Sequence, residues 1–256
     1  MMKLRFLGTG TSTGVPLIGC TCPTCISTDT HDKRLRASAI LSVEGRNILI
    51  DCGPDFRQQI IDAGAPDLTA ALITHSHYDH VGGIDDLRPY CYRDNGFPLF
   101  CKKDVADDLR ARVPYCFKEH PYPGVPIFNI HEIDENNPFF IEGIKVTPLP
   151  VVHFKLPIVG FRIHNFAYIT DAKTIPASTL KLIEGVDTLV LNSLRKEEHL
   201  SHMSLSESLD IVAKASPRIT YLTHLADRMG RHSDIENELP HNVRVAYDGL
   251  EIIIPD

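Results

Sequence analysis

The segment Thr74-His75-Ser76-His77-Tyr78-Asp79-His80 places three histidines and one aspartate within six consecutive residues, 75–80. The apolar run 70–74 precedes the cluster and reads as a strand that delivers its C-terminal end to it; Gly82-Gly83 follow. In a loop that leaves a strand end, His75 and His77 can turn toward one point, while Asp79 and His80 turn toward a neighbouring point. Imidazole and carboxylate groups together suit zinc, iron or manganese. The cluster therefore predicts metal binding rather than a polar loop that happens to be rich in histidine.

The composition is that of an ordinary soluble globular protein, with 256 residues, 43% of them hydrophobic and 23% charged. No low-complexity linker interrupts the chain, so we expect a single domain over residues 1–256. A formal net charge of −7 disfavours an extended surface for nucleic acid. No apolar run approaches the roughly 20 residues that span a bilayer. Met1–Leu7 leads into a glycine turn and reads as a strand, not a signal peptide, so we expect no membrane partner and a cytoplasmic location.

Short β-rich runs alternate with helical patterns along the chain. We expect strands at 3–7, 38–43, 47–51, 70–74, 144–148, 158–163, 166–170, 188–191, 218–223 and 243–247, and helices at 54–63, 103–112 and 204–215. Ser204 and Glu207 form the pattern of a capping box at the start of the last helix. The stretch 114–137, rich in proline and aromatic residues, is expected to be loops. Strands packed sheet on sheet with helices outside give an α/β fold, a four-layer αβ/βα sandwich, although periodicity alone does not select it over a doubly wound sheet.

The histidine cluster closely resembles the H-x-H-x-D-H motif of hydrolases with the metallo-β-lactamase fold. Asp51-Cys52-Gly53 resembles the buried aspartate turn that precedes this motif, and the resemblance runs through the whole chain. It implies three further ligands at strand ends, which His153, Asp171 and His224 match. By this resemblance one metal is held by His75, His77 and His153, a second by Asp79, His80 and His224, and Asp171 bridges the two. Asp51 is expected to orient the metal-binding loop as a hydrogen-bond acceptor.

Two such metals, roughly 3.5–4 Å apart, share a water and ionise it near neutral pH. They also stabilise charge that develops on a phosphoryl or carbonyl oxygen, which predicts hydrolysis of an ester-type bond. A proton donor for the leaving group adds about 10²- to 10⁴-fold. His202 resembles the non-ligand histidine of phosphodiesterases with this fold and, with the ligand Asp79, is our candidate catalytic residue. His199, three residues away, is the competing proton donor.

Cys20, Cys22 and Cys25 lie close together in a loop at about 19–26, where thiolates can converge on one tetrahedral structural zinc. The chain has seven cysteines, and an odd number with this clustering suits metal binding better than disulfides. The same cluster occurs in cyclic phosphodiesterases similar to the phosphonate-degradation enzyme that opens phosphoribosyl 1,2-cyclic phosphate. That enzyme completes its zinc site with a histidine three residues after the last active-site histidine. Asp227 occupies this position here and is the candidate fourth ligand, with His232 as the alternative.

These patterns predict a phosphodiesterase that cleaves a small cyclic or diester phosphate, with two zinc or manganese ions, or iron, at its active site. One alternative is a nuclease resembling the tRNA 3′-processing enzymes, for which the chain has neither a basic arm nor a basic net charge. A second is a biosynthetic accessory protein resembling protein B of pyrroloquinoline quinone biosynthesis, which has a similar fold and cysteine cluster. Homodimers are common among soluble enzymes, and a homodimer and a monomer both stay open.

Overall fold

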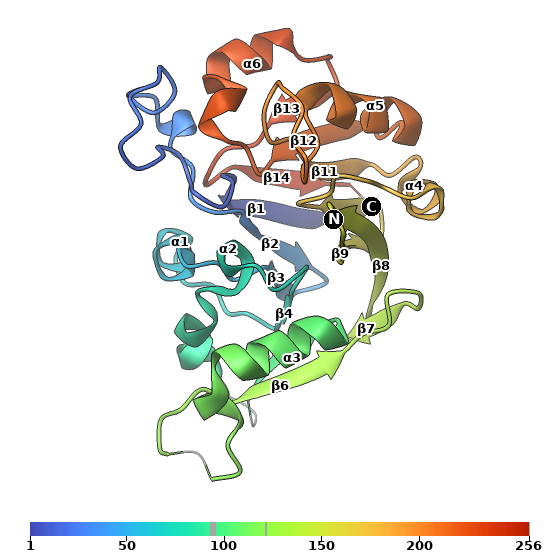
Figure 1. The fold of residues 1–256 in the computed structure, drawn as a ribbon. Helices are drawn as coiled ribbons and strands as arrows, with labels where there is room; N and C mark the ends of the chain where they lie inside the picture. Colours follow the sequence, from blue (N-terminus) through green and yellow to red (C-terminus); the bar gives the residue numbers. More distant parts are fainter. Residues whose placement is uncertain (93–95, 121, 256) are drawn as a thin grey trace.

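Two seven-stranded sheets face each other in the computed structural model, which describes residues 1–92, 96–120 and 122–255 (Figure 1). The order of the first sheet is β14-β1-β2-β3-β4-β5-β6, and that of the second is β13-β12-β11-β10-β9-β8-β7. Each sheet is antiparallel at one side and parallel at the other. The first is antiparallel from β14 to β3 and parallel from β3 to β6, and the second is antiparallel from β7 to β10 and parallel from β10 to β13.

The strands of the first sheet are β1 (Met2–Gly8), β2 (Ser38–Val43), β3 (Arg46–Ile50), β4 (Ala70–Leu72), β5 (Phe97–Cys101), β6 (Phe128–Glu132) and β14 (Glu251–Ile254). Those of the second are β7 (Phe139–Ile141), β8 (Ile144–His153), β9 (Leu156–Ile163), β10 (Phe166–Ile169), β11 (Thr188–Asn192), β12 (Ile219–Thr223) and β13 (Val243–Val245). Because β14 lies near the end of the chain and pairs with β1, the first sheet joins the two ends of the described sequence.

The helices lie on the outer faces of the sheets (Figure 1). The α-helices are α1 (Phe56–Asp62), α2 (Tyr78–Val81), α3 (Lys103–Arg112), α4 (Ala177–Ile183), α5 (Leu205–Ala215) and α6 (His232–Glu238). Short 3₁₀ turns occupy Thr30–Asp32, Ile84–Tyr90, Pro114–Phe117 and Asp227–Met229. The described residues contain no helix whose length and apolar character would suffice to cross a membrane.

Three large apolar layers, with a smaller fourth cluster around Ile235 of α6, hold the described residues together. One is sandwiched between the sheets and joins Leu4 and Ile48 of the first sheet to Phe161 and Tyr168 of the second. Another lies between the first sheet and α1 and α3, and a third lies between the second sheet and α4 and α5. Helix, sheet, sheet and helix layers in this order form the αβ/βα sandwich that the sequence predicted.

Several elements differ from their expected positions. The stretch 114–137, expected to be loops, contains β6, an edge strand whose side chains are mostly exposed and therefore form no apolar run. Strand β8 extends to His153, five residues beyond its expected end. Strands β5, β7 and β14 and helices α4 and α6 were not expected. In contrast, Ser204 and Glu207 form the expected capping box at the start of α5.

Candidate active site

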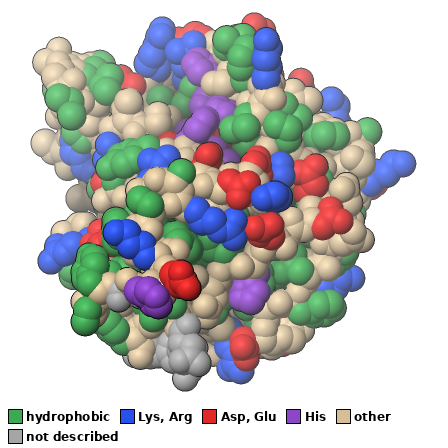
Figure 2. Space-filling model, turned by 60° about the horizontal axis from the view of Figure 1, so that its bottom comes forward, with side chains coloured by type: hydrophobic (Ala, Val, Ile, Leu, Met, Phe, Trp, Pro, Cys, Tyr) green, Lys and Arg blue, Asp and Glu red, His purple; other side chains and the backbone are tan. Residues whose placement is uncertain are grey.

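The side chains expected to form the site follow the ends of strands from both sheets. The loop after β4 carries His75 and His77, and the short helix α2 that follows carries Asp79 and His80. From the second sheet, His153 is the last residue of β8, Asp171 comes shortly after β10, and His224 directly follows β12. Since the carboxyl ends of parallel strands meet at one edge of a sheet, these residues converge. Figure 2 shows histidine side chains gathered in a hollow on the face that it presents.

His75, His77 and His153 form the first group of imidazoles. The ring centroid of His77 lies 4.6 Å from that of His75 and 5.1 Å from that of His153. The rings of His75 and His153 are 5.8 Å apart, and Nε2 of His75 lies 3.9 Å from Oδ2 of Asp171. His75 and His153 are buried, whereas His77 is exposed, so this group forms the side of the site that is open to solvent.

Asp79, His80, Asp171 and His224 form the second group, and all four are buried. One ligand-type atom from each lies within 4.8 Å of those of the others, an arrangement that could hold a metal ion. Oδ1 of Asp171 is 3.1 Å from Nε2 of His80 and 3.2 Å from Nε2 of His224. The opposite carboxylate oxygen of Asp171 faces His75, so this side chain lies between the two groups.

Asp51 fixes the orientation of the loop from behind. Its Oδ1 accepts the backbone N–H of Thr74 at 2.8 Å, and its Oδ2 accepts the hydroxyl of Thr74 at 2.9 Å. Oδ2 also lies 2.7 Å from Nδ1 of His80, which must donate to a carboxylate. A proton on Nδ1 leaves the lone pair of Nε2 directed into the site, as a metal ligand requires.

The other buried rings are oriented in the same way. Nδ1 of His153 donates to the carbonyls of Asp171 and Ser201 at 2.8 and 2.9 Å. Nδ1 of His75 lies 3.0 Å from the hydroxyl of Thr74. Because this hydroxyl donates its proton to Asp51, it can only accept a hydrogen bond from Nδ1 of His75. Both histidines therefore present Nε2 to the site. Thr74 belongs to the segment 74–80 from which metal binding was predicted, but the sequence analysis gave it no role of its own, although its position directly before the motif is a signal that could have identified one.

The turn before the motif needs a glycine. A Cβ atom on Gly53 would lie 2.1 Å from the backbone oxygen of Asp79, far inside contact distance. The backbone N–H of Cys52 also donates to the carbonyl of His80 at 2.7 Å. The Asp51-Cys52-Gly53 turn and α2 are therefore packed backbone against backbone.

The charge distribution of the second group suits a cation. Burial opposes ionisation of Asp171, but the neighbouring His224 and His80 outweigh it and hold its pKa well below the ordinary value. Burial also opposes charging of His80, yet the carboxylates of Asp171, Asp79 and Asp51 raise its pKa well above the usual range. Three buried carboxylates thus demand positive charge at this point, which is supplied either by a proton on Nε2 of His80 or by a metal ion that takes the place of that proton.

Several buried imidazole nitrogens of the described residues lack a hydrogen-bond partner. Two of them, Nε2 of His75 and Nε2 of His80, are turned toward Asp171. Buried polar atoms are normally satisfied, and imidazole nitrogens with free lone pairs beside carboxylates are a donor set that divalent metals bind. The residues present therefore fit the expected metals.

His202 lies against the site, and His199 lies farther out. Nδ1 of His202 is 3.8 Å from Oδ2 of Asp171, and its ring stacks on that of His224 at 4.9 Å. The ring of His199 is 5.3 Å from that of His202, and its Nδ1 accepts the backbone N–H of Ser201. Burial, with the charge of His224, lowers the pKa of His202 to about 3, so its imidazole is neutral at pH 7 and carries one N–H.

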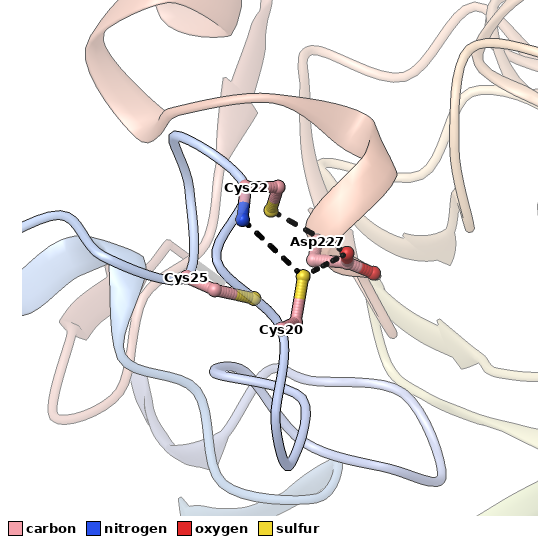
Figure 3. Close-up of side chains that lie close together, drawn as sticks. All are labelled: Cys20, Cys22, Cys25 and Asp227. Carbon is pink, nitrogen blue, oxygen red and sulfur yellow. Dashed lines mark hydrogen bonds between the residues drawn. The ribbon is translucent and has the colours of Figure 1, made fainter.

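The cysteine loop closes on Asp227, as Figure 3 shows. Sγ of Cys20 and Sγ of Cys22 each lie 3.5 Å from Oδ2 of Asp227, and the atoms of this group, which includes Cys25, lie within 4.8 Å of one another. All seven cysteines belong to the described residues, and each is a free thiol. Three thiols and a carboxylate form a four-ligand set that could hold a metal ion.

The structure does not place His232 in this group. Its ring stacks on that of His31 at 4.9 Å and meets Tyr247 edge-on at 5.6 Å. Of the two alternatives for the fourth position, the geometry brings Asp227 to the cysteines.

Two facing sheets with histidines and carboxylates clustered at their strand ends define a hydrolase fold of the metallo-β-lactamase type. A family model described as the beta-lactamase superfamily domain matches residues 46–225. A solved structure described as a new diphosphatase from the PhnP family is 33% identical and superposes with a TM-score of 0.92, covering 100% of this chain and 98% of that one. The chain therefore belongs to the beta-lactamase superfamily and, within it, to the PhnP-like branch.

Two further relatives carry different names. An octanoyltransferase of Porphyromonas gingivalis is 40% identical over the whole chain, which spans 52% of that protein's length. A ribonuclease Z of Mycobacterium sp. (strain KMS) is 26% identical over 75% of this chain and 78% of its own. The chain thus spans only about half of the first of these proteins.

Proposed function

We propose that this chain is a metal-dependent phosphodiesterase that cleaves a small cyclic or diester phosphate. The main support is the convergence of seven side chains from both sheets, with Nε2 of His75 and Nε2 of His80 facing opposite oxygens of Asp171. Membership of the PhnP-like branch and the nearby His202 favour a phosphodiester over other esters. The 33% identical relative is described as a diphosphatase, so its name also points to phosphate chemistry.

We assign His75, His77 and His153 to one metal and Asp79, His80 and His224 to a second, with Asp171 shared by both. When bound, two such divalent ions would activate a water and neutralise charge that develops on the phosphoryl group. Ligands of this kind accept zinc, manganese or iron, and availability decides which is bound.

The protein's own groups would perform the remaining tasks. Asp51, Thr74 and the carbonyl of Ser201 hold the ligating rings in orientation. Each accepts a hydrogen bond from Nδ1 of one ring, that of His80, His75 and His153 respectively. His202 offers a neutral imidazole N–H beside the shared carboxylate, where it would donate a hydrogen bond to the oxygen of the leaving group and stabilise the charge that develops there. Cys20, Cys22, Cys25 and Asp227 would hold one structural zinc that ties the N-terminal loop to the segment after β12.

Two relatives motivate competing substrates. The ribonuclease Z relative favours a tRNA precursor, against which the net charge of −7 argues. The octanoyltransferase relative suggests an octanoyl thioester, since carbonyl hydrolysis uses the same metal chemistry. Both substrates belong in the same test.

The test combines elemental analysis of purified protein with hydrolysis of four substrates: bis(p-nitrophenyl) phosphate, a 2′,3′-cyclic nucleotide, a tRNA precursor and an octanoyl thioester. We expect metal at both kinds of site, loss of activity after chelation of the dinuclear site, and preference for the small phosphodiesters. The His202→Ala variant should retain its metals and lose about 10²- to 10⁴-fold in kcat. Undiminished activity of His202→Ala, or no metal-dependent cleavage of either phosphodiester, would contradict the proposal.

A further inference from the structure

The side chain of Asn192 holds both backbone polar groups of a residue next to the candidate site. Asn192 is the last residue of β11 and is completely buried. Its Oδ1 accepts the N–H of Ala172 at 2.8 Å, and its Nδ2 donates to the carbonyl of Ala172 at 2.9 Å. An amide has one accepting and one donating end, so it can satisfy both groups at once. An ionised carboxylate of the same shape could only accept.

Ala172 directly follows Asp171, whose backbone is in an unfavourable conformation. Asp171 has φ of +58°, in the left-handed region that residues other than glycine seldom adopt. Such a conformation persists only where surrounding contacts enforce it. The two hydrogen bonds between the Asn192 side chain and the backbone of Ala172 are contacts of this kind, made one residue after Asp171.

The carbonyl of Ala172 also holds the segment that carries His202. It accepts the backbone N–H of Met203 at 3.1 Å, and the carbonyl of Met203 in turn accepts the N–H of Leu194 at 2.9 Å. A single peptide segment therefore lies between the shared carboxylate of Asp171 and the ring of His202. The positions of the Asp171 carboxylate and of the His202 ring both depend on the position of the Ala172 backbone.

Asn192 is itself firmly held, which a positioning group requires. Its carbonyl accepts the hydroxyl of Ser208 from α5 at 2.9 Å. In the sheet it pairs in register with Thr223, the residue before His224. It has no exposed surface, so it is not a residue that touches substrate.

We propose that Asn192 is a positioning residue that sets the Asp171 carboxylate and the His202 imidazole relative to each other through Ala172. This inference rests on the proposed function of the site, since it assigns Asn192 a role in metal binding and in the hydrogen bond that His202 donates to the leaving group. It predicts that loss of the amide damages both, while substrate binding changes little.

The Asn192→Asp variant tests the proposal, because it keeps the shape of the side chain and one acceptor but removes the donor to the carbonyl of Ala172. We expect the affinity for the active-site metals, measured by calorimetric titration of Mn²⁺, to fall about 10- to 100-fold. We expect kcat on bis(p-nitrophenyl) phosphate to fall by about 10²-fold, as for misplacement by about 1 Å, with KM changed less than about threefold. Asn192→Ala should show the same pattern.

The matched control is Thr179→Val in α4. Thr179 is also completely buried, and its hydroxyl donates a hydrogen bond to the carbonyl of Pro150. Loss of this hydrogen bond should destabilise the part of the molecule built on the second sheet without removing a contact to Asp171 or Ala172. This variant should bind Mn²⁺ and turn over substrate like the wild type. If Asn192→Asp fails to fold, Ser208→Ala is the second variant. It removes a hydroxyl that the carbonyls of Asn192 and Ser204 share, each at 2.9 Å, and it should reduce Mn²⁺ affinity and kcat by smaller, several-fold factors.

A double-mutant comparison separates positioning from general damage. In the His202→Ala background, Asn192→Asp should lower kcat by a smaller factor than in the wild type, because one of its two targets is already absent. Equal factors in both backgrounds, or variants that match Thr179→Val in Mn²⁺ affinity and kcat, would overturn the inference. A wild-type protein that binds no metal would instead refute the proposed function.

Discussion

At the scale of single residues, Asp51 shows how a buried carboxylate can serve a site without entering it. It is completely inaccessible to solvent, and burial raises its pKa although His80 and Thr74 oppose the rise. Three donors converge on its two oxygens, and only one of them belongs to a candidate ligand. Its ionised form is therefore stabilised by the same contacts that orient His80.

Replacing Asp51 by Asn should weaken metal binding without unfolding the protein. The amide has only one accepting oxygen, so either Thr74 or the Nδ1–H of His80 loses its acceptor. We expect metal affinity to fall about 10- to 100-fold, as for other residues that orient ligands, measured by competition with a chromogenic chelator. Asp55→Asn is the matched control, since Asp55 pairs with Arg36 outside the site. Equal affinities of the two variants would contradict the role given to Asp51.

The contiguous residues of the site could be predicted from their spacing alone, whereas the isolated ones could not. His75, His77, Asp79 and His80 stand together, so their spacing alone indicates metal binding. His153, Asp171 and His224 are single residues at strand ends and were identified only through the resemblance to a family. Asn192 is also a single residue at a strand end, but an asparagine there has many roles, and only the structure shows that its amide spans Ala172.

At the scale of elements, the sequence pattern predicted those helices and strands that carry a strong local signal. Helix α5 has a capping box and an apolar stripe, and the helix at Lys103–Arg112 has exactly the expected bounds. Strand β7 has three residues and β14 four, which is too short for alternation to stand out. Strand β5 contains Pro98, a residue that argues against a strand in sequence. Their strand pairing comes from tertiary packing, which no local pattern encodes.

The cysteine loop is an element whose structure we expect to depend on its metal. Asp227→Ala should remove one zinc per chain, seen by elemental analysis, and lower the melting temperature, because residues 20–25 would lose their tie to the segment after β12. Asp227→His should retain the zinc, since imidazole is an equally good ligand.

The control for this loop is Asp234→Ala, an exposed carboxylate that borders the same hollow as Asp227 and is not one of the four candidate ligands. It should keep both its zinc and its melting temperature. Full zinc content in Asp227→Ala would show that Asp227 is not a ligand.

At the scale of the whole molecule, the two sheets have the same plan. Each runs from antiparallel to parallel strands, and the candidate ligands follow strands of both. Hydrophobic periodicity predicts strands and helices but contains no record of which strands pair, so it could not separate this sandwich from a doubly wound sheet. The resemblance of the histidine motif to that of metallo-β-lactamase-fold hydrolases favoured the sandwich over the doubly wound sheet. Since β14 pairs with β1, we infer that residues 1–256 form one domain.

Asp248 connects the two ends of the chain. It accepts the hydroxyl of Thr9 at 2.7 Å and the backbone N–H of Leu35 at 2.6 Å. Burial raises its pKa to about 6, although both hydrogen bonds oppose the rise. Carboxyl groups of aspartate in unfolded chains titrate near 3.9, so the folded protein binds this proton more tightly. The resulting stabilisation is complete below about pH 4 and is lost as the pH rises through about 6.

Asp248→Asn should remove this pH dependence, because the amide takes up no proton. Relative to the wild type, the free energy of unfolding of the variant should therefore rise by about 1 kcal/mol between pH 5 and pH 7. For a chain of this size that is roughly 2–4 °C in melting temperature, measured at equal metal saturation at each pH. Any hydrogen bond weakened by the substitution shifts all points alike and leaves this slope unchanged. Asp210→Asn on the exposed side of α5 is the matched control, because it makes the same change of side chain and leaves Asp248 in place. If the free energy of unfolding of Asp248→Asn differed from that of the wild type by the same amount at every pH, proton binding by Asp248 would not be coupled to folding.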